Sequence, residues 1–319
     1  MDYKKLFFLS ITLLIAGGCI LFRTVEYETA DGIALQKLDC KLHSDVNSGK
    51  IILQNNKNIL TLQLNSRSAD FNGYKIWFFS PVIADSYGDL RISKTDVEKI
   101  INPLFYQTYK HCRPIKKIVL DPGHGGEDSG AVNKEIKEKD LNLALCKKIK
   151  TALDAKGFEV LLTRNDDTFV SLNDRSKFAE QHDADVFISI HHNASLQPDT
   201  IGTETYALTA AGAESTHNSP NISKAVRRGN SFDNANIILS YLIHSKVISN
   251  INTFDRGMKF ARYKVLVQAP CPAILFEAGF VSNITEAAEC HSEIRQKKTA
   301  EAIAAAVKIF AERCSLTLQ

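Results

Sequence analysis

The stretch Ile118–Gly130, IVLDPGHGGEDSG, marks the change from a buried strand to a loop that carries a candidate ligand residue. Its apolar, β-branched run ends abruptly at Asp121 and Pro122, and His124 follows between glycines. Such a run is typical of a strand buried on both faces, and glycines allow a backbone to approach a ligand closely. Open α/β sheets bind ligands beyond the carboxyl ends of their strands, so the pattern predicts a ligand site at His124.

From Lys117 onward, strand-like and helix-like segments alternate. This alternation predicts an α/β fold with a mostly parallel, twisted sheet of about six strands flanked by helices, which we assign to residues 117–314. Helices are expected to begin at Glu138 and near Ser171, and the last one at about Ser292–Arg313. The strands are expected at Ile118–Leu120, Glu159–Thr163, Val186–Ile190, Gly202–Leu208, Val265–Gln268 and Ala273–Phe276.

Residues 27–110 have a different pattern, which predicts a small α+β module before that domain. A short helix is expected at Ser93–Leu104, with Ser93 as its cap. The module loosely resembles the strand-rich N-terminal domain of copper amine oxidases, and His111–Lys116 is the expected linker. Its strands are expected at Lys50–Leu53, Ile59–Leu64 and Lys75–Phe79.

The first 22 residues are expected to direct export. Lys4 and Lys5 precede an apolar run that extends to Phe22, which is typical of a signal peptide or a short membrane anchor. The segment 16–19, AGGC, resembles the box before the lipidated cysteine of bacterial lipoproteins, although Ala16 stands where a bulky residue is usual. A spanning helix needs ~20 apolar residues, so a cleaved signal, a lipid on Cys19 and an uncleaved anchor all stay open. We expect an exported, membrane-associated protein of the periplasm or cell envelope.

The composition sets broad limits. With 44% hydrophobic and 24% charged residues, the 319-residue chain is typical of a globular protein. A net charge of +3 and the lack of a basic stripe do not favour nucleic acid as a partner. Seven cysteines suit an exported protein; Cys40 and Cys112 could form a bridge, and Cys146 is expected in the core. Without a CxxC pair, a cysteine-ligated zinc site is not expected.

Two later positions add ligand chemistry to His124. Glu138 begins the block EKDLNL at a helix start, where a carboxylate could instead serve only the helix dipole. His191 ends the strand FISI, and we prefer it to His192 because strand alternation directs the next side chain to the other face.

Glu277 ends a further apolar strand, in the segment ILFEAG. A carboxylate on a buried strand is costly unless it is paired or bound to a metal, and burial would raise its pKa toward the range useful for proton transfer. An ion pair with Arg256 or Arg262 is the alternative. Two imidazoles and one carboxylate form a catalytic zinc set that leaves a position for water, and a separate carboxylate supplies a base. The combination suits amide hydrolysis.

Five blocks in order, DPGHGGEDSGAV, EKDLNL, FISIHHNA, GTETY and ILFEAGFVSN, resemble those of the zinc-dependent N-acetylmuramoyl-L-alanine amidases (amidase 3 type) over about residues 117–310. The resemblance implies Zn²⁺ bound by His124, Glu138 and His191, with Glu277 as the catalytic base. It also implies peptidoglycan as the substrate, cleaved at the amide that joins the lactyl group of muramic acid to L-alanine of the stem peptide.

Two positions in the third block are candidate substrate contacts. His192 stands where the family commonly has a small residue, so it is either a bystander or a contact, and Asn193 follows it. The long polar stretch Thr209–Asn236 is either a lid or wall-binding loop or an ordinary surface excursion. The sequence identifies no activator protein.

Three other functions share features of this sequence. A zinc peptidase acting within the stem peptide would use the same residues. A non-catalytic wall-binding protein with this fold is disfavoured because all four implied zinc and base residues are intact. A cysteine hydrolase built on Cys271 is disfavoured because no histidine is paired with it, and a GxSxG serine elbow is absent.

Overall fold

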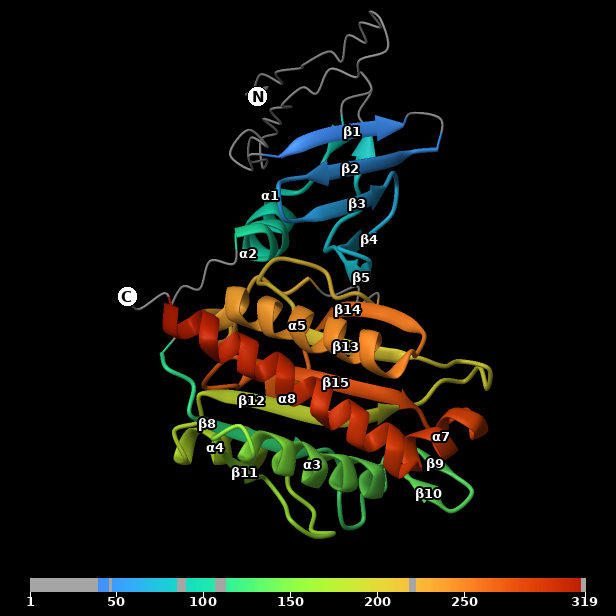
Figure 1. Cartoon of the computed structure of the whole chain (residues 1–319), viewed down its shortest axis with the longest axis vertical. Helices are drawn as coiled ribbons and strands as arrows, with labels where there is room; N and C mark the ends of the chain where they lie inside the picture. Colours follow the sequence, from blue (N-terminus) through green and yellow to red (C-terminus); the bar gives the residue numbers. More distant parts are fainter. Residues whose placement is uncertain (1–39, 46–47, 85–89, 107–112, 218–221, 317–319) are drawn as a thin grey trace, which may run out of the picture. The chain divides into compact units, whose positions relative to one another are not determined.

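The computed structural model describes residues 40–45, 48–84, 90–106, 113–217 and 222–316 (Figure 1). The chain divides into two compact units, residues 1–107 and 108–319. The expected export segment at residues 1–22 and the bridge partner Cys112 lie outside the described residues. Within the described part of the chain, we find no helix with the length and apolar character needed to cross a membrane.

The first unit contains an antiparallel sheet in which consecutive strands are neighbours, β1 through β5. A two-stranded ladder of β6 (Ile83–Ala84) and β7 (Leu90–Arg91) follows it. The strands of the sheet are β1 (Lys41–Asp45), β2 (Lys50–Gln54), β3 (Ile59–Gln63), β4 (Ser68–Phe71) and β5 (Tyr74–Trp77).

Alternation of apolar and polar residues explains how this sheet forms its core. In β2 and β3 every second side chain is buried, including Leu53 and Leu60, because successive side chains point to opposite faces of a strand. The buried face packs against the helical segment, where the rings of Phe71 and Phe105 lie 5.4 Å apart. The three strands expected in the module and its helix are present.

The helical segment of the first unit consists of α1 (Lys94–Asp96), the π-helical turn η2 (Val97–Ile101) and α2 (Asn102–Tyr106). Ser93 caps it as expected, since its Oγ accepts from the Asp96 N–H at 3.0 Å. The fully buried Asp96 carboxylate accepts in turn from the backbone N–H of Phe79 at 2.7 Å and of Ser80 at 3.2 Å. Asp96 therefore ties the helix start to the chain that follows β5.

The second unit contains a six-stranded sheet in the order β14-β13-β15-β12-β8-β11. All neighbouring pairs are parallel except β13 and β15. The expectation of a mostly parallel sheet flanked by helices is confirmed, although the described chain has more than six strands because the first unit adds its own. The strands are β8 (Lys117–Pro122), β11 (Glu159–Leu162), β12 (Val186–Asn193), β13 (Thr203–Leu208), β14 (Asp255–Ala261) and β15 (Ala273–Phe280), with a hairpin of β9 (Val132–Asn133) and β10 (Ile136–Lys137).

Helices cover both faces of this sheet. Three long helices, α3, α5 and α8, lie side by side on one face (Figure 1), where Ile149, Ile243 and Ile303 contribute to one large apolar core that also contains Cys146, as expected. The other face is covered by the shorter α4 and α6. The helices are α3 (Glu138–Asp154), α4 (Leu172–Gln181), the 3₁₀ turn η3 (Arg228–Phe232), α5 (Asp233–Ile251), α6 (Lys264–Val267), α7 (Ile284–His291) and α8 (Glu293–Leu316).

One expected strand is wrong. Val265–Val267 lie in the short helix α6 and Gln268 is its C-cap, and the strand beside β13 is formed instead by β14, Asp255–Ala261. A short apolar run does not distinguish strand from helix by periodicity. The sequence of β14, DRGMKFA, carries charges that disguise it, because the fully buried Lys259 is balanced by an ion pair with Glu204 on the neighbouring strand.

We predict that Asp96→Ala lowers the free energy of unfolding of the first unit by about 1–3 kcal/mol, because two backbone N–H groups lose the buried acceptor that Asp96 provides. The only tryptophan of the chain, Trp77, lies in β5, so its fluorescence during urea unfolding reports on this unit. Glu98→Ala, on the exposed side of the same helical segment, is the control and should change the value by less than about 0.5 kcal/mol. Equal effects of the two substitutions would contradict the role of Asp96.

Candidate metal centre

His124 lies just past the end of β8, in a backbone conformation that non-glycine residues seldom adopt. Its φ is +61°. The preceding Gly123 donates to the carbonyl of Ile190 at 3.0 Å, which fixes the loop beside β12. The His124 ring is oriented on one side by Asp128, whose Oδ2 lies 2.8 Å from Nδ1. The other ring nitrogen, Nε2, is thereby directed at Glu138, as expected for a ligand.

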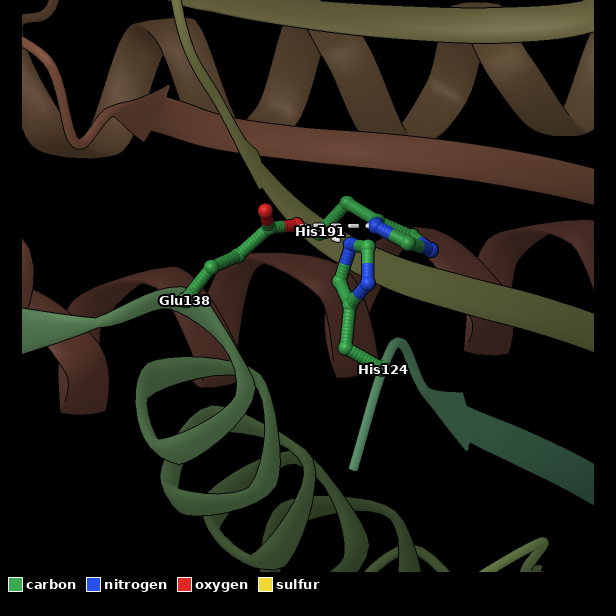
Figure 2. Close-up of side chains that lie close together, drawn as sticks. All are labelled: His124, Glu138 and His191. Carbon is green, nitrogen blue, oxygen red and sulfur yellow. Dashed lines mark hydrogen bonds and ion pairs between the residues drawn. The ribbon is translucent and has the colours of Figure 1, made fainter. Parts of the chain in front are cut away.

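Glu138 is the first residue of α3 and brings the two histidines together (Figure 2). Its Oε1 lies 3.1 Å from His124 Nε2 and 2.9 Å from His191 Nδ1. The carboxylate also accepts from the backbone N–H of Ala131 at 2.9 Å and of His192 at 3.2 Å. With only 5% of the residue exposed, Glu138 is a buried anion shared between two imidazoles.

The adjacent histidines of β12 have opposite orientations. His191 faces the cluster, and its ring lies edge-on to that of His124 with centroids 5.0 Å apart. His192 is 1% exposed, bonded to Asn142 of α3 at 2.7 Å, and burial lowers its pKa to about 3. Strand alternation turns the His192 ring into the core, which favours the bystander of the two roles considered for it.

The residues present fit a small cation. One ligand atom from each of His124, Glu138 and His191 lies within 4.8 Å of the others, and a tetrahedral ion with bonds of ~2.0 Å separates its ligands by about 3.3 Å. The space is shaped by glycines: a Cβ on Gly123 would lie 2.2 Å from the His191 ring, and one on Gly130 would lie 2.5 Å from Glu138 Oε2. Ring nitrogens and a carboxylate are the donor set of a divalent transition ion.

The electrostatics of the cluster also favour a cation. Burial raises the pKa of Glu138, but its hydrogen bonds and charge interactions with the two histidines outweigh burial and hold the pKa well below the ordinary value of 4.5. Burial lowers the pKa of His124, whereas Glu138 and Asp128 raise it, with a net increase above 6.5. The buried carboxylate thus requires positive charge beside it, which either protons on the rings or a metal ion can supply.

Glu277 lies in β15, next to the cluster. It pairs in register with His191 on β12, and in the described structure its buried Oε2 has no hydrogen-bond partner. Burial is the main cause that raises its pKa well above 4.5, and the charges of Glu138 and Glu204 add to the effect. The expected direction of the shift is confirmed, and the group is suited to accept a proton from water.

Sequence reasoning did not anticipate the polar cluster beside Glu277. Glu204 on β13 pairs in register with Glu277, and it accepts from Lys259 at 2.6 Å and Arg256 at 2.8 Å. Tyr206 and Asn193 donate to its other oxygen at 2.7 and 3.1 Å. Arg256 therefore binds Glu204, and not Glu277 as the alternative interpretation proposed. Alternation in the predicted strand Gly202–Leu208 places Glu204 and Tyr206 on one face. Only the pairing of β13 with β15 shows that Glu204 lies beside Glu277.

Three further candidates are located by the structure. Asn193 is half-buried at the end of β12, so its contact with substrate stays a prediction. Cys271 is buried at the start of β15, away from Glu277, and burial raises its pKa to about 12, which disfavours a thiolate nucleophile. The stretch Thr209–Asn236 contains η3 and the start of α5, and His217 reaches the Tyr206 hydroxyl at 3.0 Å.

A family model described as N-acetylmuramoyl-L-alanine amidase matches residues 118–309. The chain belongs to this family. LytC, an N-acetylmuramoyl-L-alanine amidase of Bacillus subtilis (strain 168), is 34% identical over 186 residues, which are 58% of this chain and 34% of LytC. The chain thus spans about a third of that relative.

Solved structures of amidases have the same fold. The catalytic domain of CwlV, an N-acetylmuramoyl-L-alanine amidase from Bacillus (Paenibacillus) polymyxa var. colistinus, is 32% identical with a TM-score of 0.53, covering 62% of this chain and 99% of that domain. The CwlD amidase of Clostridioides difficile, in complex with the GerS lipoprotein, is 27% identical with a TM-score of 0.51, covering 64% of this chain and all of CwlD.

We predict that the metal-free protein loses stability in acid through Glu138. Because the folded-state pKa of Glu138 is lowered, its contribution is fully present above about pH 4.5 and is lost as the pH falls toward the lowered pKa. Between pH 5 and 3, Glu138→Gln should therefore lose about 1–3 kcal/mol less unfolding free energy than the wild type. Urea unfolding followed by circular dichroism measures this difference. Glu135→Gln, at an exposed acid in the preceding hairpin, should behave as the wild type does.

Proposed function

We propose that this protein is a zinc-dependent N-acetylmuramoyl-L-alanine amidase that hydrolyses the amide between muramic acid and L-alanine in peptidoglycan. The observation that carries the proposal is the juxtaposition of a His-Glu-His cluster with Glu277, a buried carboxyl group that has an unpartnered oxygen within the described structure. Family membership supports the choice of substrate and bond. His124, Glu138 and His191 would hold the ion.

In the proposed reaction the three ligand residues hold the zinc ion, and Glu277 transfers the proton. When bound, zinc supplies Lewis acidity, which polarises the scissile carbonyl and acidifies water. Glu277 accepts a proton from the attacking water as its oxygen adds to the carbonyl carbon. The same carboxyl group then returns that proton to the amide nitrogen as the carbon–nitrogen bond breaks, which releases a free L-alanine amine and a lactyl carboxylate. Lys259 and Arg256 form ion pairs with Glu204. The charge of Lys259 lowers the pKa of Glu277, but burial and the neighbouring carboxylates raise it by more.

We also propose that the protein is exported and associated with the membrane, because of the apolar run before residue 22. Because the related CwlD amidase forms a complex with the GerS lipoprotein, we further propose that this protein binds a lipoprotein, whose identity is not specified by the sequence. For the N-terminal module expected at residues 27–110, we propose a role in positioning substrate or partner, since it contributes none of the residues of the cluster.

Digestion of purified muropeptides, with products read by mass, tests the activity. We expect the zinc-loaded protein to release intact stem peptides and a chelator to abolish the release. Glu277→Ala should lower kcat by about 10²–10⁴-fold, the usual contribution of a general base, while zinc affinity stays within a few-fold of the wild type. Cleavage inside the stem would identify a peptidase. The proposal fails if the wild type releases no stem peptide and Glu277→Ala behaves identically.

Deletion of residues 31–109 tests the role of the first unit. The family model matches residues 118–309, and 62% of this chain covers 99% of the CwlV catalytic domain, so we expect the truncated chain to fold. We expect the rate of hydrolysis of small soluble muropeptides to stay within about threefold of the full chain, because the proposed catalytic groups all lie after residue 117. Activity on insoluble peptidoglycan should fall more steeply. Complete loss of activity on soluble substrates would refute this division of roles.

A further inference from the structure

Backbone carbonyls of the loop that carries His124 are held by three positively charged side chains. These side chains are Arg164, Arg175 and Lys139, and none of them is a candidate ligand. The hydrogen bonds run from Arg164 Nε and Arg175 Nη1 to Pro122 O at 2.9 and 2.7 Å, from Arg164 Nη2 to Gly123 O at 2.9 Å, from Arg175 Nη2 to His124 O at 2.9 Å, and from Lys139 Nζ to Gly126 O at 2.8 Å.

Both arginines are almost completely buried, with 4% of Arg164 and 3% of Arg175 exposed. Arg175 is neutralised by the buried Asp121 at 2.7 Å. Arg164 has no carboxylate within ion-pair distance among the described residues, and its other hydrogen bonds go to the carbonyls of Asp166 and Lys139. Burying a guanidinium has a large desolvation cost unless it is fully hydrogen-bonded. Here the hydrogen bonds that offset this cost go to backbone carbonyls of the His124 loop and its neighbours.

The segment held by these side chains contains a residue with a strained backbone. His124 has a φ of +61°, which persists in a side-chain-bearing residue only where its surroundings fix it. Packing is tight as well: a Cβ on Gly125 would lie 2.3 Å from the Thr168 carbonyl and 3.1 Å from Arg164 Cδ. Donors on successive carbonyls leave the peptide planes around His124 no freedom to relax, and those planes determine where its ring points.

We propose that Arg164, Arg175 and Lys139 are positioning residues that hold His124 in its left-handed conformation and so preorganise the metal centre. This inference rests on the proposed function, because it assigns the three cations a purpose in metal binding. We call these three side chains the clamp. Weakening the clamp should weaken metal binding, because loss of a side chain that holds a metal ligand in place commonly lowers metal affinity about 10–100-fold.

The test uses the full chain with Arg164→Lys and Arg175→Lys, which keep the charge but remove the rigid planar guanidinium whose separate nitrogens reach different carbonyls. The matched control is Arg262→Lys, since Arg262 donates to the carbonyls of Ala213 at 2.6 Å and Ala210 at 3.3 Å in a loop without a ligand. Two quantities are measured: the zinc dissociation constant by chelator competition, and hydrogen exchange of the peptide spanning residues 122–126 in the metal-free protein.

We expect each clamp variant to bind zinc about 10–100-fold more weakly. Exchange should become at least about tenfold faster in the 122–126 peptide alone, as expected for a local opening. The control should change neither quantity. Zinc affinity within threefold of the wild type, or exchange that accelerates equally across the whole second unit, would overturn the proposal, because a merely structural role predicts that outcome.

Two further results are distinguishable. If the wild type binds no zinc, the proposed function fails, and the exchange measurement alone still decides whether the clamp holds the loop. If the arginine variants do not fold, Lys139→Ala replaces them, because Lys139 lies at the outer end of the clamp beside the exposed Asp167. It should weaken zinc binding and accelerate exchange at residues 122–126 by several-fold, and no change in either would overturn the proposal.

Discussion

The buried carboxylate of Glu138 is the interaction on which the site depends. An anion with 5% exposure is stable only where donors surround it. Here the donors are two imidazoles, the backbone N–H groups of Ala131 and His192, and the side-chain amide of Asn142. That requirement fixes where α3 begins, which way the His191 ring turns and how close the His124 loop must approach. The same concentration of negative charge and lone pairs is what a divalent cation needs.

The sheet supplies the rest of the geometry. β8, β12 and β15 are adjacent and parallel, so their carboxyl ends meet at one edge, where His124 follows the first strand and His191 and Glu277 share a register position on the other two. Because both faces of these strands are buried, the positions of the residues at this edge are fixed, and most water is excluded from Glu277. The pKa of its carboxyl group stays raised because burial and the charges of Glu138 and Glu204 outweigh the opposing charge of Lys259, which is ion-paired with Glu204 on β13.

Stability is given up locally for this arrangement. A left-handed histidine, two buried arginines and a carboxyl group with an unpartnered oxygen are each unfavourable in isolation. They occur together at one edge of a sheet whose opposite end and large helical core are conventional in packing. Violations of local rules concentrated in this way are typical of functional sites.

The sequence by itself determined the alternation of strands and helices, the capped helix at Ser93, and the candidates His124, Glu138, His191 and Glu277, because apolar periodicity, caps and residue chemistry are local signals. It failed for α6 and β14, where a three-residue apolar run and a charged strand carry no clear period. It left the role of His192 open, because its partner Asn142 is 50 residues away. Only the tertiary structure decided which carboxylate binds Lys259 and Arg256, and which carbonyls Arg164 and Arg175 hold. Those pairings join residues that are far apart in the chain. The strength of each interaction depends on how buried the two groups are and how close they lie in space, and a local sequence pattern predicts neither.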